Sequence, residues 1–314
     1  MDIWLIVVLV GGILLGGLEV TLRVLFGFGD PLVYIPDEEI GYLLAPNQRV
    51  KRMGNRVEIN QFSMRGQGIE KDCPMGGKRV LLLGDSVANG GWWTDQEQII
   101  SRCLEGELGE KLGGIPVQVL NASANSWGPR NELAYVQRFG LFGARVVVVL
   151  INTDDLFGVA PSPVLVGRDR NYPDRKPLSA LTEVYSRYLT PARPVPQWEA
   201  HQKEPGDRVG FNLAALEGIY AIAQAQNAHL IIALTPLLRE LDPTGPKDYE
   251  IIARNRLQSF TEAHPLTYID FLPLFAQHSQ PEALYRDHIH LSPRGNQEVS
   301  QTLIPPLLAA LKAP

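Results

Sequence analysis

Five short apolar runs are spaced along the chain from residue 78 onward, with helix-like segments between and after them. The apolar runs cover residues 80–83, 117–120, 146–151, 229–234 and 267–271. Runs of this length that are rich in branched residues are typical of strands buried on both faces of a sheet. Helical segments are expected at residues 95–112, 131–139 and 211–226. The alternation predicts an α/β fold, a three-layer α/β/α sandwich around a mostly parallel five-stranded sheet. A closing helix is expected after Ser292-Pro293, with a break at Pro305-Pro306.

The amino-terminal segment has a different pattern. Residues 3–18 are all apolar or glycine, and the apolar pattern resumes after Glu19 as far as residue 28. A helix over this stretch is long enough to cross a bilayer, so we predict a transmembrane anchor at residues 1–28. The alternative is a cleaved signal peptide. It is disfavoured because no basic residue precedes the apolar run and no small-x-small cleavage site follows it.

The orientation of this anchor is open. Basic residues follow the apolar segment, which by the positive-inside rule favours a cytoplasmic globular part. A single anchor near the amino terminus, however, often exports the domain that follows it. We expect a single-pass membrane protein with an extracytoplasmic domain.

The rest of the chain divides at changes of pattern. Residues 29–75 contain several prolines and glycines and predict an irregular lead-in that packs on the main domain. The main domain is expected at residues 76–314. It is interrupted at 157–210 by a proline-rich insertion of the kind that forms a lid, a binding loop or a mobile surface segment.

Composition narrows the class of protein. The chain has 314 residues, 45% of them hydrophobic, which is enough for a large core. A formal charge of −5 gives no reason to expect a nucleic-acid partner. The cysteines are Cys73 and Cys103, too few for a disulfide framework. They form one bridge if the domain is exported, or they are plain buried thiols, the interpretation we favour.

Candidate chemistry begins where the first strand of the main domain ends, at Gly84-Asp85-Ser86. Parallel sheets carry their active groups at the carboxyl edge, and a turn of this kind presents a serine hydroxyl there. Near the other end of the chain, Asp287 and His290 supply a carboxylate and an imidazole three positions apart. Together the three side chains predict a serine nucleophile with an oriented general base.

At these positions the chain resembles the SGNH hydrolase superfamily, the GDSL-type esterases and lipases. The resemblance runs from about residue 78 to the carboxyl terminus. It rests on Gly84-Asp85-Ser86, on residues 121–128 (NASANSWG), on 152–155 (NTDD) and on 287–290 (DHIH). It implies Ser86 as the nucleophile, with Asp287 and His290 as its partners. The lead-in, with Gly41-Tyr42, Pro46-Asn47 and Met64-Arg65-Gly66, looks like that of the membrane-anchored bacterial members.

The resemblance also implies an oxyanion hole, and here the chain departs from the family pattern. The amide of Ser86 is one donor, and Ser123 stands where the family has a glycine whose amide is another. Asp154 stands where the family has an asparagine side-chain donor. Loss of one such donor typically costs about 3 kcal/mol of transition-state stabilisation. The site works if Asp154 is protonated, or if it points away and Asn125 or Asn152 donates instead.

Other residues near these motifs have two interpretations each. Asp85 is a candidate for binding substrate, but we expect it to order the turn beside Ser86 rather than to react. Trp92, Asn125 and Trp127 either bind substrate or pack in the core. His288 is expected to be exposed or structural. A metal held by His288 and His290 with Asp154 or Asp155 is disfavoured because no compact ligand motif supports it, so we expect no metal and no cofactor.

Three functions are compatible with these motifs. The first is a membrane-anchored serine esterase or acyl hydrolase that cleaves an O-acyl ester of a small molecule, a glycan or a lipid. An O-acyltransferase of the same fold is the second, with a hydroxyl in place of water as acceptor. The third is a non-catalytic protein of the same fold that binds a glycan or a partner, for which Asp154 is the main support. No pattern in the chain indicates an oligomeric state.

Overall fold

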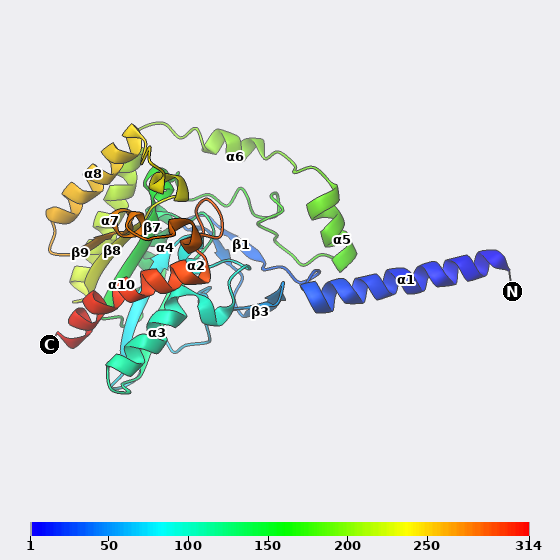
Figure 1. Ribbon diagram of the computed structural model, residues 1–314, viewed down its shortest axis with the longest axis horizontal. Helices are drawn as coiled ribbons and strands as arrows, with labels where there is room; N and C mark the ends of the chain where they lie inside the picture. The colour runs from blue at the N-terminus through cyan, green and yellow to red at the C-terminus, as the bar shows by residue number, and fades with distance from the viewer. Residues whose placement is uncertain (1, 314) are drawn as a thin grey trace.

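In the computed structural model, which describes residues 2–313, a long helix projects from an α/β body (Figure 1). This helix, α1 (Ile3–Phe26), has no buried residue along its length. It is the one described helix that is long and apolar enough to cross a membrane, a property that signal sequences share. Gly27 ends it in a left-handed conformation, with φ of 72°.

The body is built around five parallel strands in the order β6-β5-β7-β8-β9, which confirms the predicted fold class. The strands are β5 (Lys78–Gly84), β6 (Val117–Ser123), β7 (Val146–Asn152), β8 (His229–Thr235) and β9 (Thr267–Asp270). Every side chain of β7 is buried, as the unbroken apolar run predicts for the central strand of a parallel sheet.

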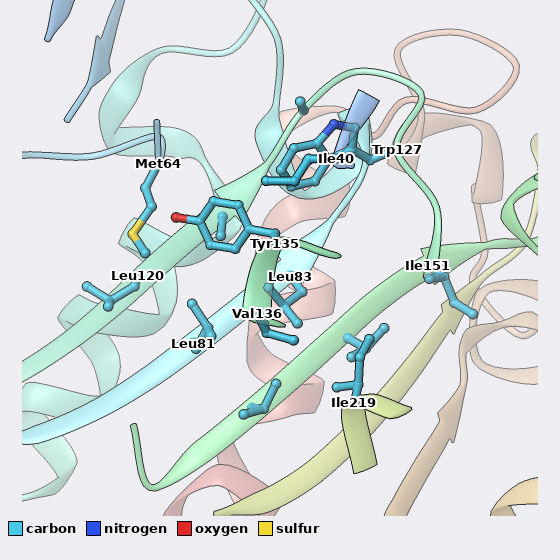
Figure 2. Packing of buried hydrophobic residues seen from close by; sticks show 14 of the residues in the cluster. Ile40, Met64, Leu81, Leu83, Leu120, Trp127, Tyr135, Val136, Ile151 and Ile219 are labelled. Carbon is cyan, nitrogen blue, oxygen red and sulfur yellow. The ribbon is translucent and has the colours of Figure 1, made fainter. Parts of the chain in front are cut away.

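Helices cover both faces of this sheet. Side chains such as Leu81 and Leu83 of β5 pack toward α4 (Pro129–Phe139), α7 (Arg208–Ala225) and α8 (Asp248–Glu262). Figure 2 shows this layer, with Tyr135 of α4 and Ile219 of α7 against the strands. The alternate side chains of β5 face α3 (Ile100–Lys111), α9 (Phe271–Ala276) and α10 (Pro293–Lys312). Short helices join these elements: α2 (Ser86–Asn89), η1 (Gln96–Gln98), η2 (Thr153–Phe157), η4 (Leu238–Leu241) and η5 (Pro281–Leu284).

The predicted break in the closing helix is wrong, because α10 continues through Pro305 and Pro306 to Lys312. Two internal prolines remove two backbone donors, which is unfavourable in an isolated helix. Here the turns on both sides of the prolines bury Leu303, Leu307 and Leu311 completely against the sheet. This packing holds the helix together where local propensity alone would end it.

The lead-in at residues 29–75 is more regular than the sequence predicted. It contains two antiparallel hairpins, β1 (Tyr34–Asp37) with β2 (Gly41–Leu44) and β3 (Gln48–Arg52) with β4 (Asn55–Ile59). The β3–β4 turn is formed by Met53 and Gly54, both at positive φ. Two-residue hairpin turns need such angles, but methionine seldom adopts them, so the sequence did not indicate the turn.

The hairpins and the insertion both contact other parts of the chain. The Tyr42 carbonyl in β2 accepts a hydrogen bond from the Trp127 indole N–H, which joins the lead-in to the body. The insertion forms α5 (Ala180–Val184), the π-helical turn η3 (Tyr185–Leu189) and α6 (Pro196–His201). In Figure 1, α5 lies beside the carboxyl end of α1. Cys73 and Cys103 are both free.

Candidate active site

Ser86 stands at the start of α2, directly after β5 reaches the carboxyl edge of the sheet. The turn depends on Gly84, because a Cβ there would lie 2.5 Å from the Leu150 carbonyl oxygen of β7. Asp85 caps α2 by accepting a hydrogen bond from the Val87 N–H at 2.7 Å, and its other carboxylate oxygen lies 3.1 Å from Ser86 Oγ. Through these contacts Asp85 orders the turn.

His290 and Asp287 meet Ser86 from the other end of the chain. His290 Nε2 lies 2.9 Å from Ser86 Oγ, and its Nδ1 lies 2.9 Å from Asp287 Oδ2. The loop that carries them is closed by the Tyr285–Leu291 bridge and by an Arg286 N–H that donates to the His290 carbonyl at 2.8 Å. The three side chains named from the sequence thus form one continuous relay.

The electrostatics suit the relay. Partial burial opposes ionisation of Asp287, but hydrogen bonds from the His290 backbone N–H and ring and from the Ile289 N–H outweigh it, so the pKa of Asp287 lies below its usual range. An ionised Asp287 accepts from Nδ1–H, which leaves Nε2 free to accept the Ser86 proton.

Trp93 forms a wall beside the imidazole. Its ring centroid lies 4.4 Å from that of His290, and the Arg286 guanidinium lies over the Trp93 ring at 4.8 Å. Trp92 packs edge-on against Trp93. These rings limit the water that reaches His290, whose side chain is 20% exposed.

A group of buried acids lies beneath the nucleophile. The Asn152 amide donates at 2.9 Å to both Asp85 and Asp155. Burial, with Asp85 nearby, raises the pKa of Asp155 well above its usual range, and the same two causes raise the pKa of Glu132. Neither carboxyl oxygen of Glu132 has a hydrogen-bond partner among the described residues. A carboxyl in this setting is held neutral.

Two cavities meet at Ser86 and His290. The smaller, of about 280 Å³, is lined by Trp92, Trp93 and Asn125 and extends to Arg52 and Tyr188. The larger, of about 770 Å³, extends toward Asp154, His288 and residues of the insertion such as Leu165 and Trp198. A bound molecule can therefore approach the serine hydroxyl from either side.

The predicted oxyanion residues are placed differently. Ser123 is 1% exposed, lines neither cavity and accepts a hydrogen bond from Asn89. The side-chain amide of Asn152 donates its hydrogens to Asp85 and Asp155, so none is left to donate to a substrate. Asp154 lies at the rim of the larger cavity, where burial raises its pKa and Arg239 opposes the rise.

Other groups are better placed to donate at the cavity. Ser126 follows β6, lines both cavities and has φ of 58°, a conformation that favours glycine. Its Oγ accepts from the Tyr172 hydroxyl at 2.9 Å. Asn125 lines the smaller cavity, and within the described chain no partner holds its side-chain amide. Ser126 lies within the 121–128 motif, but the sequence pattern assigned the amide donor to Ser123, because the backbone angle of Ser126 is set by the fold.

The remaining candidate site residues lie either in the core or in the lining of the larger cavity. Trp127 is 2% exposed and packs on Tyr135, so it belongs mainly to the core. The side chain of His288 is 82% exposed at the larger cavity. Across residues 2–313, no group of three or more His, Cys, Asp or Glu is placed to hold a metal ion.

With the sheet and this site in view, the chain belongs to the GDSL-like lipase/acylhydrolase family, whose model matches residues 82–298. Solved structures of similar fold include an acetyl xylan esterase at 14% identity and TM-score 0.50, covering 73% of this chain and 99% of that one. A lipase/acylhydrolase from Enterococcus faecalis gives 14% identity and TM-score 0.48, over 75% of this chain and 97% of that one. These likenesses concern the fold. No protein with a curated description matches the sequence.

Proposed function

We propose that the protein is a serine esterase that cleaves an O-acyl ester and is held at a membrane by α1. The observation that carries the proposal is the relay, in which His290 Nε2 lies 2.9 Å from Ser86 Oγ and Nδ1 lies 2.9 Å from Asp287. Such contacts activate a hydroxyl that is otherwise a weak nucleophile. Membership of an ester-cleaving family supports the same chemistry.

In the proposed mechanism, His290 takes the Ser86 proton as Oγ attacks the acyl carbonyl carbon. The alcohol then leaves with that proton, and the acyl group stays on Oγ. Water attacks this acyl-enzyme, gives a proton to His290 and releases the carboxylic acid as Ser86 is restored. The backbone N–H groups of Ser86 and Ser126 and the Asn125 amide are the oxyanion donors we assign.

The role of α1 as an anchor rests on its contact with the body. Glu19 of α1 accepts hydrogen bonds from the Ala180 N–H at 2.8 Å and the Leu181 N–H at 2.9 Å. Cleavage of α1 as a signal peptide would remove Glu19, and the mature domain would lose the acceptor for these two N–H groups. The contact therefore favours a retained helix over a cleaved signal peptide.

A fluorophosphonate probe tests the assignment of the nucleophile. The wild-type chain is expected to be labelled, and Ser86→Ala is expected to abolish labelling and ester turnover. Ser259→Ala, a change at an exposed serine of α8, is the matched control and should behave as wild type. Labelling that persists in Ser86→Ala contradicts the mechanism. A wild-type chain that never reacts favours a binding protein of this fold.

An O-acyltransferase is the second candidate, and the pair of cavities at Ser86 favours it. One cavity can hold the acyl donor while the other holds an acceptor hydroxyl that replaces water. Product analysis with a polyol added to the assay separates the two reactions. An acylated polyol formed in preference to free acid indicates the transferase, whereas free acid alone indicates the hydrolase.

A further inference from the structure

The smaller cavity leads from the relay to the joint between α1 and the body. Its lining includes Ser86 and His290 of the relay and also Asp30, Arg52 and Tyr188. Asp30 follows α1 by four residues, and Tyr188 belongs to η3 of the insertion. The lining of the cavity therefore reaches the place where the chain emerges from α1.

Buried and charged contacts hold this joint. Glu183, 4% exposed, accepts from the Gly29 N–H at 2.6 Å and pairs with Arg52 at 2.6 Å and Arg187 at 3.0 Å. The Arg52 guanidinium also lies 4.1 Å above the Phe28 ring. Because Glu19 caps α5 at the same place, the insertion is fixed alongside the last two turns of α1.

Large apolar side chains of the insertion are exposed at this joint. We call them the platform: Leu178, Tyr185, Tyr188 and Leu189, which are 96%, 60%, 61% and 71% exposed. Monomeric soluble proteins seldom expose such side chains in a cluster. Tyrosine is enriched where a protein crosses from lipid to water, since its ring is apolar and its hydroxyl polar.

The length of α1 sets the level of the platform. The uncharged part, residues 3–18, spans only about 24 Å at 1.5 Å per residue, less than the roughly 30 Å of a hydrocarbon core. The apolar side chains Val20, Val24 and Leu25 extend this span and are themselves exposed. A core of roughly 30 Å needs about 20 residues, so it extends past Val20 to the level of Glu19 and Arg23, where α5 is docked.

We propose that the platform is seated on the bilayer surface, so that the entrance of the smaller cavity opens at the membrane and the ester substrate is an amphiphile drawn from it. This inference rests on the proposed esterase function for its substrate. The seating itself follows from α1 and the platform alone.

The seating is tested with a fluorescent label in vesicles. The full-length chain with Cys73→Ser and Cys103→Ser receives Leu189→Cys, is labelled with a nitrobenzoxadiazole dye and is reconstituted into phosphatidylcholine vesicles that carry doxyl-labelled lipid. Quenching is expected at position 189. Ile252→Cys, at an exposed position of α8 on the far side of the body, is the control and should not be quenched. Equal quenching at both sites, or none at 189, overturns the proposal.

The source of the substrate is tested with two esters. Tyr185→Glu with Leu189→Glu places charge on the platform without altering a cavity-lining residue. We expect at least about a tenfold lower rate on 4-methylumbelliferyl palmitate held in the vesicles and less than about a twofold change on soluble p-nitrophenyl acetate. Ile251→Glu with Ile252→Glu should change neither rate. An equal loss on both esters, or no loss on the vesicle-borne ester, contradicts the inference. A wild-type chain that cleaves neither ester contradicts the proposed function. The quenching experiment at position 189 then tests the seating of the platform independently of activity.

Discussion

Asp154 is the residue whose chemistry fits the proposed reaction least. Its carboxyl lies at the rim of the larger cavity, which Ser86 and His290 also line. An ionised carboxylate there repels the negative charge that develops on the acyl oxygen. The raised pKa reduces this repulsion at low pH, but the group supplies no amide donor.

Asp154→Asn is therefore expected to raise kcat on an activated ester by about tenfold, since it replaces a repulsive group with a hydrogen-bond donor. Steady-state rates with p-nitrophenyl acetate measure the effect. Asp169→Asn changes a second carboxylate that lines the same cavity and should leave kcat within about twofold. A fall in kcat for Asp154→Asn would show that the carboxylate has a positive role.

The relay makes a separate prediction at Asp287. Replacing it with asparagine removes the acceptor that holds His290 Nδ1–H, and a side-chain amide can stabilise the wrong tautomer. We expect Asp287→Asn to lower kcat by about 10³- to 10⁴-fold while the protein stays folded. Circular dichroism checks the fold, and ester turnover checks the rate. A loss of less than about tenfold would remove Asp287 from the relay.

At the scale of elements, Arg254 of α8 holds together three segments at the carboxyl edge of the sheet. It lies 2.8 Å from each of its partners, which are the Glu240 carboxylate in η4, the Asp270 carboxylate in β9 and the Thr153 hydroxyl in η2. Glu240 is 2% exposed. Removal of Arg254 leaves this carboxylate buried without its cation and frees the turn that carries Asn152 and Asp154.

Arg254→Ala is expected to cost about 3–5 kcal/mol of unfolding free energy, the usual effect of breaking one side of a buried pair. Arg256→Ala, two residues further along α8, removes an exposed pair with Asp207 and should cost less than about 1 kcal/mol. Urea unfolding of both variants provides the comparison. Similar losses of unfolding free energy in Arg254→Ala and Arg256→Ala would mean that burial of the Arg254 pair does not affect stability.

Much of the element pattern was predictable from the sequence, and the exceptions have physical causes. The inner strands β5, β7 and β8 were predicted because each is a compact apolar run in a sheet covered on both faces. The edge strand β9 is only partly buried. α10 was predicted with a break because the two prolines outweigh the local pattern, whereas the packing of Leu303 and Leu307 is a tertiary effect. The β3–β4 hairpin was missed because Met53 adopts a positive φ that its side chain does not favour.

The site divides in the same way. Ser86, Asp287 and His290 were recognisable because local motifs carry them, and the structure brings them together. Ser126 lies in the recognised 121–128 motif, but its role as a donor could not be predicted, since only the path of the chain after β6 gives it a left-handed backbone and a place at both cavities. The raised pKa values of Glu132 and Asp155 were also not predicted. A single acidic residue in a segment of both polar and apolar residues gives no sign in the sequence that it is buried.

For the whole molecule, Glu132 makes stability depend on pH. In the folded chain its pKa lies well above the usual 4.5 because the carboxyl is buried near Asp85, whereas in the unfolded chain it ionises normally. The folded state thus binds the extra proton, and this contribution is complete at low pH. Stability is lost by about 1.4 kcal/mol per pH unit as pH rises from about 4.5 toward the folded pKa.

Glu132→Gln removes this titration while keeping the shape of the neutral acid. Its unfolding free energy is expected to equal or fall below that of the wild type near pH 4.5 and to exceed it increasingly toward pH 8. Urea midpoints measured at several pH values give the comparison. Glu38→Gln, at an exposed carboxylate of the lead-in, should follow the wild-type curve. A constant gap across the pH range would show that Glu132 is charged in the folded protein.

The hydrogen bonds from Ala180 and Leu181 to Glu19 have a practical consequence for purification. A common way to obtain a soluble sample is to delete the hydrophobic leader, here the first 28 residues. That deletion would leave two amides of α5 without their acceptor and would turn the Gly29 N–H into a charged terminus beside Glu183. If α1 is retained as proposed, kinetics recorded on such a trimmed chain would describe a protein with an altered joint between α1 and the body. The full-length chain, held in detergent or in a nanodisc, is then the preparation on which substrate preference should be measured.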